Sequence, residues 1–186
     1  PFRVEDCYQK LVKQLKEEVI PKLERVSGVK FDIDRLREYL KKSTKAEDDL
    51  VRALRAIPSA GRGPRILGAH LEGPFLSANR LGTHSLNGRR DPDVALLERL
   101  LEAGPVRLMT LAPELPGALE LIDVLHERGV TVSLGHTDAT AVEANAAFDR
   151  GARTVTHVFN AMRPLAHRDP GIVGAALVRP DVVIQA

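Results

Sequence analysis

The sequence predicts an α/β fold built on a parallel sheet, preceded by a separate helical segment. Two observations carry this prediction. After about residue 50, short apolar runs alternate with segments of helical periodicity. Near the same point the basic residues change in kind: all 8 lysines lie at or before Lys45, whereas 15 arginines and no lysine follow. This break in composition divides the chain into a helical segment, residues 1–50, and a second part, residues 51–186.

The first segment has the periodicity of amphipathic helices. Apolar side chains recur at three- and four-residue steps over residues 8–26, which predicts a helix kinked at Pro21 and ended by Gly28. A second helix is predicted over residues 33–40. The run SGVKFDIDRLREYL, residues 27–40, resembles a helical segment of the 2-hydroxyacyl-CoA dehydratase and benzoyl-CoA reductase family. It carries none of that family's cluster ligands, so no function follows from it.

The second part reads as a series of strands and helices in alternation. The strand-like runs are RILGAHLEG, VRLMTLAP, VTVSLGH, RTVTHVF and DVVIQA, and helical patterns cover residues 94–101, 119–125 and 139–151. Thr140 and Glu143 form a capping box for the last of these helices. Gly104, Gly129 and Gly151 stand where helices should stop. Alternation of this kind predicts a parallel sheet buried on both faces.

Polar residues that could bind a metal follow three of the predicted strands. Glu72 ends the first strand, with His70 beside it, while His136 ends the third and His157 the fourth. The carboxyl ends of parallel strands share one edge, so these side chains could converge. Two imidazoles and a carboxylate suit Zn²⁺, Fe²⁺ or a similar ion with water in an open position.

Each of these residues also has a simpler interpretation. A histidine at a strand end is commonly a hydrogen-bonded loop residue, and Glu72 before Gly73 could cap a turn. Asp138 is as consistent with a helix cap as with a catalytic acid, and His126 fits a surface position late in a helix. The coincidence of three strand ends, rather than any single residue, favours a metal site.

Composition excludes several classes of protein. The net charge of +2 gives no sign of a nucleic-acid partner. The single cysteine, Cys7, excludes an internal disulfide framework and fits the cytoplasm. We expect no membrane association, because no apolar run has the length of a membrane span and no signal-peptide core is present.

Three ordered motifs, AHLEGPFLSANRLGTHS, SLGHTDATAVEANAAFDRGARTVTHVFNAM and HRDPGIVGAAL, resemble the N-acetylglucosamine-6-phosphate deacetylases of the amidohydrolase superfamily. The resemblance implies a metal-dependent (β/α)₈ TIM barrel, of which residues 51–186 form an incomplete segment. It implies hydrolysis of the N-acetyl group of the sugar phosphate, giving glucosamine 6-phosphate and acetate. A homodimer is compatible with it.

The resemblance also implies roles for individual residues. Glu72, His136 and His157 match metal ligands, and His84 in LGTHS matches a catalytic, substrate-contacting histidine near the acetyl carbonyl. The remaining substrate contacts match Asn160, Ala161 and Arg168, with Arg168 at the phosphate. His70 is then expected to support the strand end.

Some of the family's pattern is missing from this sequence. There is no HxH motif, and no counterpart of the later strand-end aspartate that serves as general base. Two rival hypotheses follow: a chimeric or truncated non-enzymatic chain that retains at most metal binding, and an acyl-CoA dehydratase component. One cysteine argues against the iron–sulfur cluster that the last would need.

Overall fold

The structure, a computed structural model, describes residues 13, 17, 20–27, 46–57 and 66–186. The chain divides into two compact units, residues 1–41 with 58–66 and residues 42–57 with 67–186. The described helix of the first unit is α2 (Ile20–Ser27), with Pro21 in its first turn, where a missing N–H costs nothing. The helix predicted over residues 33–40, and any kink before Pro21, fall outside the described residues.

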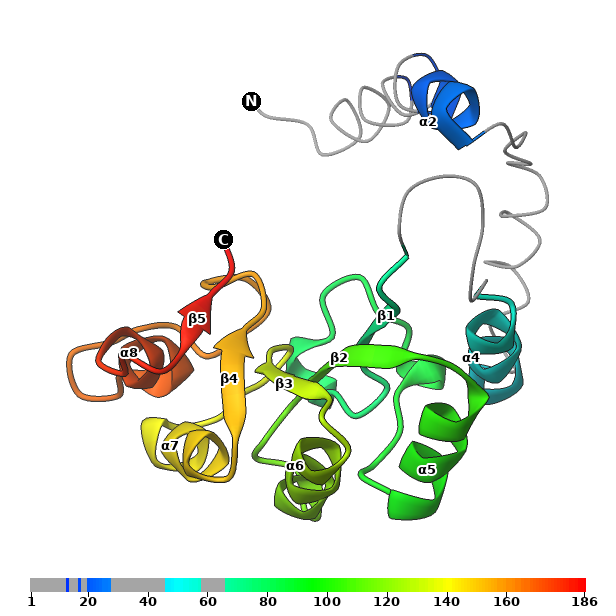
Figure 1. Ribbon diagram of the computed structural model, residues 1–186. Helices are drawn as coiled ribbons and strands as arrows, with labels where there is room; N and C mark the ends of the chain where they lie inside the picture. The colour runs from blue at the N-terminus through cyan, green and yellow to red at the C-terminus, as the bar shows by residue number, and fades with distance from the viewer. Residues whose placement is uncertain (1–12, 14–16, 18–19, 28–45, 58–65) are drawn as a thin grey trace. The chain divides into compact units, whose positions relative to one another are not determined.

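The second unit is built on a parallel sheet of five strands, as the sequence predicts (Figure 1). Their order in the sheet is their order in the chain: β1 (Ala69–Glu72), β2 (Val106–Leu111), β3 (Thr131–Leu134), β4 (Ala152–Val155) and β5 (Val183–Ile184). All four neighbouring pairs are parallel. The carboxyl ends of β1 to β4 therefore meet at one edge, where chemistry is expected.

Helices cover one side of this sheet and follow its curve in an arc (Figure 1). They are α4 (Ala46–Arg55), α5 (Val94–Ala103), α6 (Ala118–Glu127), α7 (Ala141–Asp149) and α8 (Gly171–Leu177), with short 3₁₀ turns η3 (Ala78–Arg80) and η4 (Leu86–Gly88). The capping box of Thr140 and Glu143 is present at the start of α7. The α5 helix ends at Gly104, as predicted.

Two elements differ from the sequence-based expectation. Residues 65–73 predict a long first strand, but β1 spans only four residues, since its pairing with β2 begins at Ala69, and Ile66 and Leu67 before it are exposed. The α8 helix was not predicted, since its seven residues include Gly171 and Gly174 and its N-cap position holds a proline without a side-chain acceptor.

The core lies between the sheet and its helices. The largest fully buried side chains include Leu97, Leu100, Leu121, Leu125, Phe148 and Ile172, which come from α5, α6, α7 and α8. Leu54 of α4 joins the same cluster. The predicted boundary near residue 50 falls inside α4, and a division of the chain by origin near that point stays a prediction.

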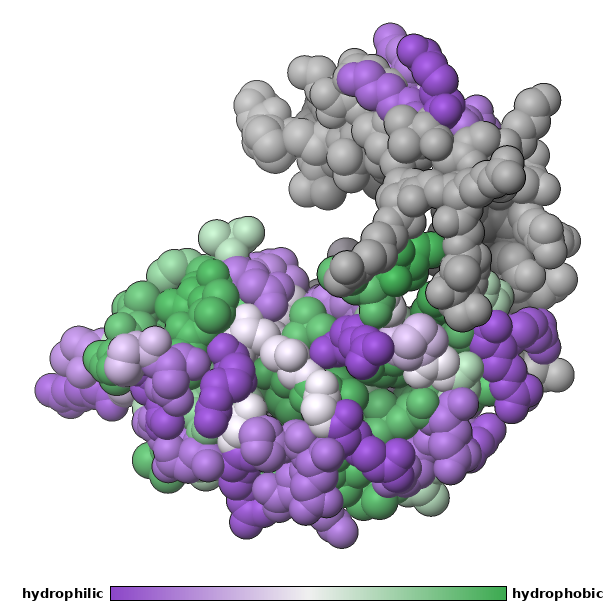
Figure 2. Space-filling model, viewed as in Figure 1, coloured by the Kyte–Doolittle hydropathy of each residue, from purple (hydrophilic) through white to green (hydrophobic). Residues whose placement is uncertain are grey.

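The surface of the second unit is uneven in polarity. Figure 2 shows hydrophilic side chains gathered over the outer helices and an apolar area over α8 and β5. Leu177, Val178 and Val183 are exposed in these two elements or directly beside them. Among the described residues, no helix combines the length and apolar character needed to cross a membrane.

Candidate metal centre

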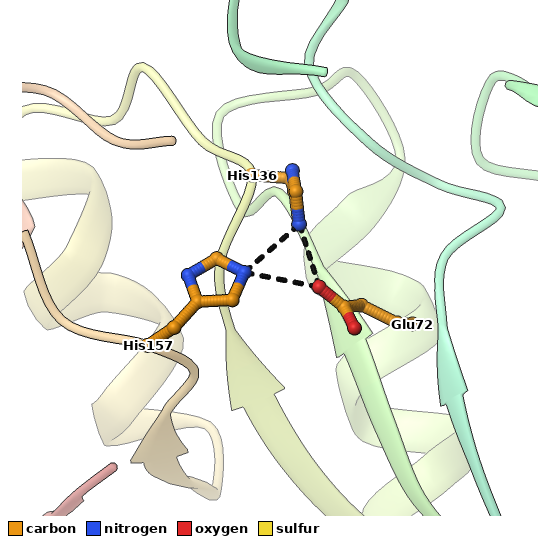
Figure 3. A group of neighbouring side chains, drawn as sticks. All are labelled: Glu72, His136 and His157. Carbon is orange, nitrogen blue, oxygen red and sulfur yellow. Dashed lines mark hydrogen bonds and ion pairs between the residues drawn. The ribbon is translucent and has the colours of Figure 1, made fainter. Parts of the chain in front are cut away.

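Three strand ends bring Glu72, His136 and His157 together. Glu72 is the last residue of β1, while His136 and His157 each follow the end of their strand by two residues, after β3 and β4. In Figure 3 both imidazole rings and the carboxylate point toward a common centre. The ligand atoms that these side chains offer all lie within 4.8 Å of one another.

The contacts at this centre join potential metal ligands. Glu72 Oε1 lies 2.6 Å from Nε2 of His136 and 3.0 Å from Nε2 of His157, and the two Nε2 atoms are 3.0 Å apart. His136 is buried, whereas Glu72 and His157 retain some access to solvent.

The hydrogen bonds at the far side of each ring fix its tautomer. Nδ1 of His136 lies 2.9 Å from the carbonyl oxygen of Arg80, and Nδ1 of His157 lies 3.1 Å from that of Asn160. A carbonyl oxygen only accepts, so each Nδ1 donates its proton there. Both Nε2 atoms then direct lone pairs at the centre, beside a carboxylate that also only accepts. A cation held between these three acceptors satisfies all of them, and backbone acceptors behind metal-binding histidines are the usual support.

The backbone at both histidines adopts an uncommon conformation. His136 has φ 47° and His157 has φ 35°, in the left-handed region that non-glycine residues seldom adopt. Such conformations persist where surrounding structure enforces them, commonly at functional sites. Gly82 lies against the His136 ring, where a Cβ atom would come within 3.3 Å of Cε1. A larger residue at position 82 would press on this ligand.

Burial and neighbouring charge alter the titration of three side chains. Burial works to raise the pKa of Glu72, but the influence of the adjacent His136 and His157 outweighs it and the pKa lies below its usual range. The pKa of His84 is lowered by burial and by the nearby His136. Burial also lowers the pKa of His70, against the attraction of Glu72. His84 and His70 thus favour their neutral forms.

His84 lies beside the three converging ligands. Its Nε2 is 3.7 Å from Glu72 Oε1, and its ring meets that of His136 edge-on with centroids 4.5 Å apart. His84, His70 and Glu72 line the same cavity of about 410 Å³. A molecule in that cavity would meet Glu72 and this imidazole.

The other predicted substrate contacts lie on the segment between β4 and α8. Asn160 supplies the carbonyl that orients His157, although its side chain is exposed. Ala161 has φ 47°, and its carbonyl accepts from the amide of Thr137. Arg168 is exposed farther along the same segment. Their roles toward a substrate stay predictions.

Asp138 neither caps α7 nor stands free as an acid. The N-cap of α7 is Thr140. The Asp138 carboxylate binds Arg80, with Nη2 at 2.7 Å, and lies 3.6 Å from Nη2 of Arg163. This pair ties η3, which supplies the carbonyl behind His136, to the loop that carries His136.

Glu114 is a residue of this site that sequence reasoning missed. It follows β2, and its two carboxylate oxygens accept from the Thr137 hydroxyl at 2.5 Å and from the Asp138 amide at 2.6 Å. Both donors come directly after His136. Only its place after a strand, in LAPELPG, could have drawn attention to it.

Replacing Glu114 with alanine is expected to destabilise the protein. Hydrogen bonds to a charged group contribute about 1.5–3 kcal/mol each at most, and Glu114 is half-buried, so we expect a loss of about 2 kcal/mol in the free energy of unfolding. Urea denaturation of the metal-free protein would measure it. Glu120→Ala, at an exposed position of α6, is the control. Equal stabilities for the two variants would contradict the role assigned to Glu114.

No family model matches the chain. Curated relatives do. The N-acetylglucosamine-6-phosphate deacetylase of Lysinibacillus sphaericus is 42% identical over 115 residues, covering 61% of this chain and 30% of the relative. The human enzyme of the same name is 46% identical over 125 residues, covering 63% and 31%. An N-acetylgalactosamine-6-phosphate deacetylase of Escherichia coli O157:H7 is 39% identical over 130 residues, covering 69% and 34%.

A solved structure of a deacetylase is also similar to this chain. The N-acetyl-D-glucosamine-6-phosphate deacetylase of Mycobacterium smegmatis superposes with a TM-score of 0.65 at 43% identity, over 76% of this chain and 36% of that one. Over this stretch the chain is similar to N-acetylglucosamine-6-phosphate deacetylases. The family accounts for the parallel sheet as part of a TIM-type barrel. The chain spans about a third of the length of these deacetylases. The comparisons give no support to the dehydratase resemblance of residues 1–50.

Proposed function

We propose that this chain takes part in hydrolysing the N-acetyl group of N-acetylglucosamine 6-phosphate, as a metal-dependent deacetylase. The observation that carries the proposal is the convergence of three acceptors, Glu72, His136 and His157, with both imidazole protons engaged elsewhere. The reaction and the sugar-phosphate substrate are inferred from the similarity of this chain to the deacetylases. The place we infer for the protein is the cytoplasm.

The donor set suits a divalent ion such as zinc or iron. When bound, such an ion supplies a Lewis acid and lowers the pKa of a coordinated water from 15.7 toward about 7. Glu72, His136 and His157 would hold it. Glu72 lines the same cavity as His84, which leaves room for a substrate amide beside it.

His84 is the residue that we assign to the acetyl carbonyl. Its neutral imidazole can donate one N–H to the oxygen on which negative charge develops, and such donors lower the barrier most when they are fixed in advance. The edge-on contact with His136 limits rotation of the ring. We assign Arg168, with Asn160 and Ala161, to the sugar phosphate, because a guanidinium group pairs well with phosphate oxygens.

Acetate release tests the proposal. The protein would be loaded with zinc and given N-acetylglucosamine 6-phosphate, the galactosamine isomer, or N-acetylglucosamine without phosphate. We expect release from the first, little from the third, and none after a chelator removes the metal. A chain that binds the metal but releases no acetate from any of the three would support the rival hypothesis of a non-enzymatic metal-binding chain.

A further inference from the structure

A row of hydrogen-bonded side chains runs across the four strands that lead to the metal centre. His70 Nε2 lies 2.8 Å from Oγ1 of Thr110, which lies 2.8 Å from Oγ1 of Thr156, which in turn lies 2.6 Å from Oγ of Ser133. We call these four residues the hydroxyl belt. The hydroxyl groups of Thr110, Ser133 and Thr156 belong to residues that are at most 4% exposed.

The belt touches the chain next to every proposed ligand. Thr156 directly precedes His157, and Thr110 is the register partner of Glu72 on the neighbouring strand. Gly135, directly before His136, lies against the belt, where a Cβ atom would come within 2.9 Å of Thr110 and 3.0 Å of Thr156. Thr156 links two parts of the belt, since its hydroxyl contacts both Thr110 and Ser133.

The direction of the belt follows from counting protons. If His70 Nε2 accepts, the three hydroxyl groups each donate once, from Ser133 to Thr156 to Thr110 to His70. In the opposite direction the proton of Ser133 would lack an acceptor among the side chains that the structure describes. In either direction, loss of the Thr156 hydroxyl breaks the belt at two hydrogen bonds.

We propose that Thr156 is a positioning residue of the metal centre: through the hydroxyl belt it fixes the strand ends that carry Glu72, His136 and His157 relative to one another. The inference rests on the proposed metal centre. Its physical basis is that a tight ion site needs ligands held at fixed separations, and buried hydrogen bonds between strands resist sliding in the plane of the sheet.

Thr156→Val removes the hydroxyl and keeps the shape of the side chain. We expect the dissociation constant for zinc to rise about 10–100-fold, the range typical when a supporting residue behind metal ligands is lost. Thr156→Ser restores the hydroxyl and should return affinity close to that of the parent. Zinc affinity would be measured by competition with a chromogenic chelator, and the stability of the metal-free proteins by thermal unfolding.

Thr154→Val is the matched control. Thr154 lies on β4, which Thr156 directly follows, and it is also 4% exposed; its hydroxyl accepts from Nε2 of Gln185 at 2.9 Å, outside the belt. We expect it to lower stability like Thr156→Val but to leave zinc affinity unchanged. Ser133→Ala, which removes the end of the belt with the least change in volume, should weaken zinc binding less than Thr156→Val and serves if that variant fails to fold.

The outcomes separate the two proposals. If the parent binds zinc and both Thr156→Val and Ser133→Ala bind it equally well, the belt has no positioning role and the metal centre stands. Equal weakening by Thr154→Val and Thr156→Val would mean a general effect of stability and would also overturn the inference. If the parent protein itself binds no zinc, both the metal centre and the role of Thr156 are wrong.

Discussion

The His136→Ala variant is expected to lose zinc when the parent protein keeps it. Metal binding at structural zinc sites contributes about 10–16 kcal/mol over four ligands, so one imidazole accounts for about 3 kcal/mol, or roughly a hundredfold in dissociation constant. His136 is the most buried of the three proposed ligands, and its Nε2 lies 2.6 Å from Oε1 of Glu72. Elemental analysis after dialysis against a weak chelator would measure the loss.

His126→Ala is the control for this experiment. His126 is an exposed histidine near the end of α6 and is not part of the proposed ligand group. We expect its metal content to equal that of the parent. His157→Ala should behave like His136→Ala. Unchanged metal content in both ligand variants would falsify the assignment of the centre.

Slow turnover is the second large effect that we expect. The 186-residue polypeptide loaded with zinc should release acetate from N-acetylglucosamine 6-phosphate about 10²–10⁴-fold more slowly than a full-length relative, since a positioned acid–base group contributes that much. The departing amine must receive a proton. Among the described residues, the proposed ligand group holds one carboxylate, Glu72, and the carboxylate of Asp138 is engaged by Arg80.

The comparison requires equal metal loading. The deacetylase of Lysinibacillus sphaericus is a suitable reference, and kcat/KM for acetate release is the quantity to compare. Comparable values for the two proteins would show that a further base is unnecessary. If Asp138→Asn abolished the remaining activity at unchanged metal content, the base would be Asp138, and the purely structural role given to its ion pair would be wrong.

The sequence predicts the framework of this site well. Apolar runs and helix caps locate β1 to β4, and the residues at or just after their ends include all three members of the proposed ligand group. The prediction succeeds because the carboxyl ends of parallel strands lie at one edge of the sheet, whatever the conformation of the loops. The capping box at Thr140 was predictable for a similar reason, since both of its partners lie within four residues.

The support behind the ligands could not be predicted in the same way. The carbonyl that orients His136 belongs to Arg80, 56 residues away, and Arg80 pairs with Asp138, 58 residues away. No periodicity connects such positions. The left-handed backbone at His136 and His157 is equally hidden, because histidine carries no conformational signal comparable to that of glycine. Loop geometry of this kind follows from packing between elements and not from local preference.

The strictly sequential order of the strands has a consequence for how the protein forms during synthesis. Each strand of the second unit pairs with the strand that follows it in the chain, so every pairing closes a short stretch of polypeptide. Pairing with the next strand costs less loop-closure entropy than pairing with a more distant one. The sheet can therefore grow one strand at a time as the ribosome releases it. Glu72 and His136 are in place early, but His157 and the carbonyl of Asn160 emerge later. An ion bound by all three proposed ligands could be captured at full affinity only after β4 has docked.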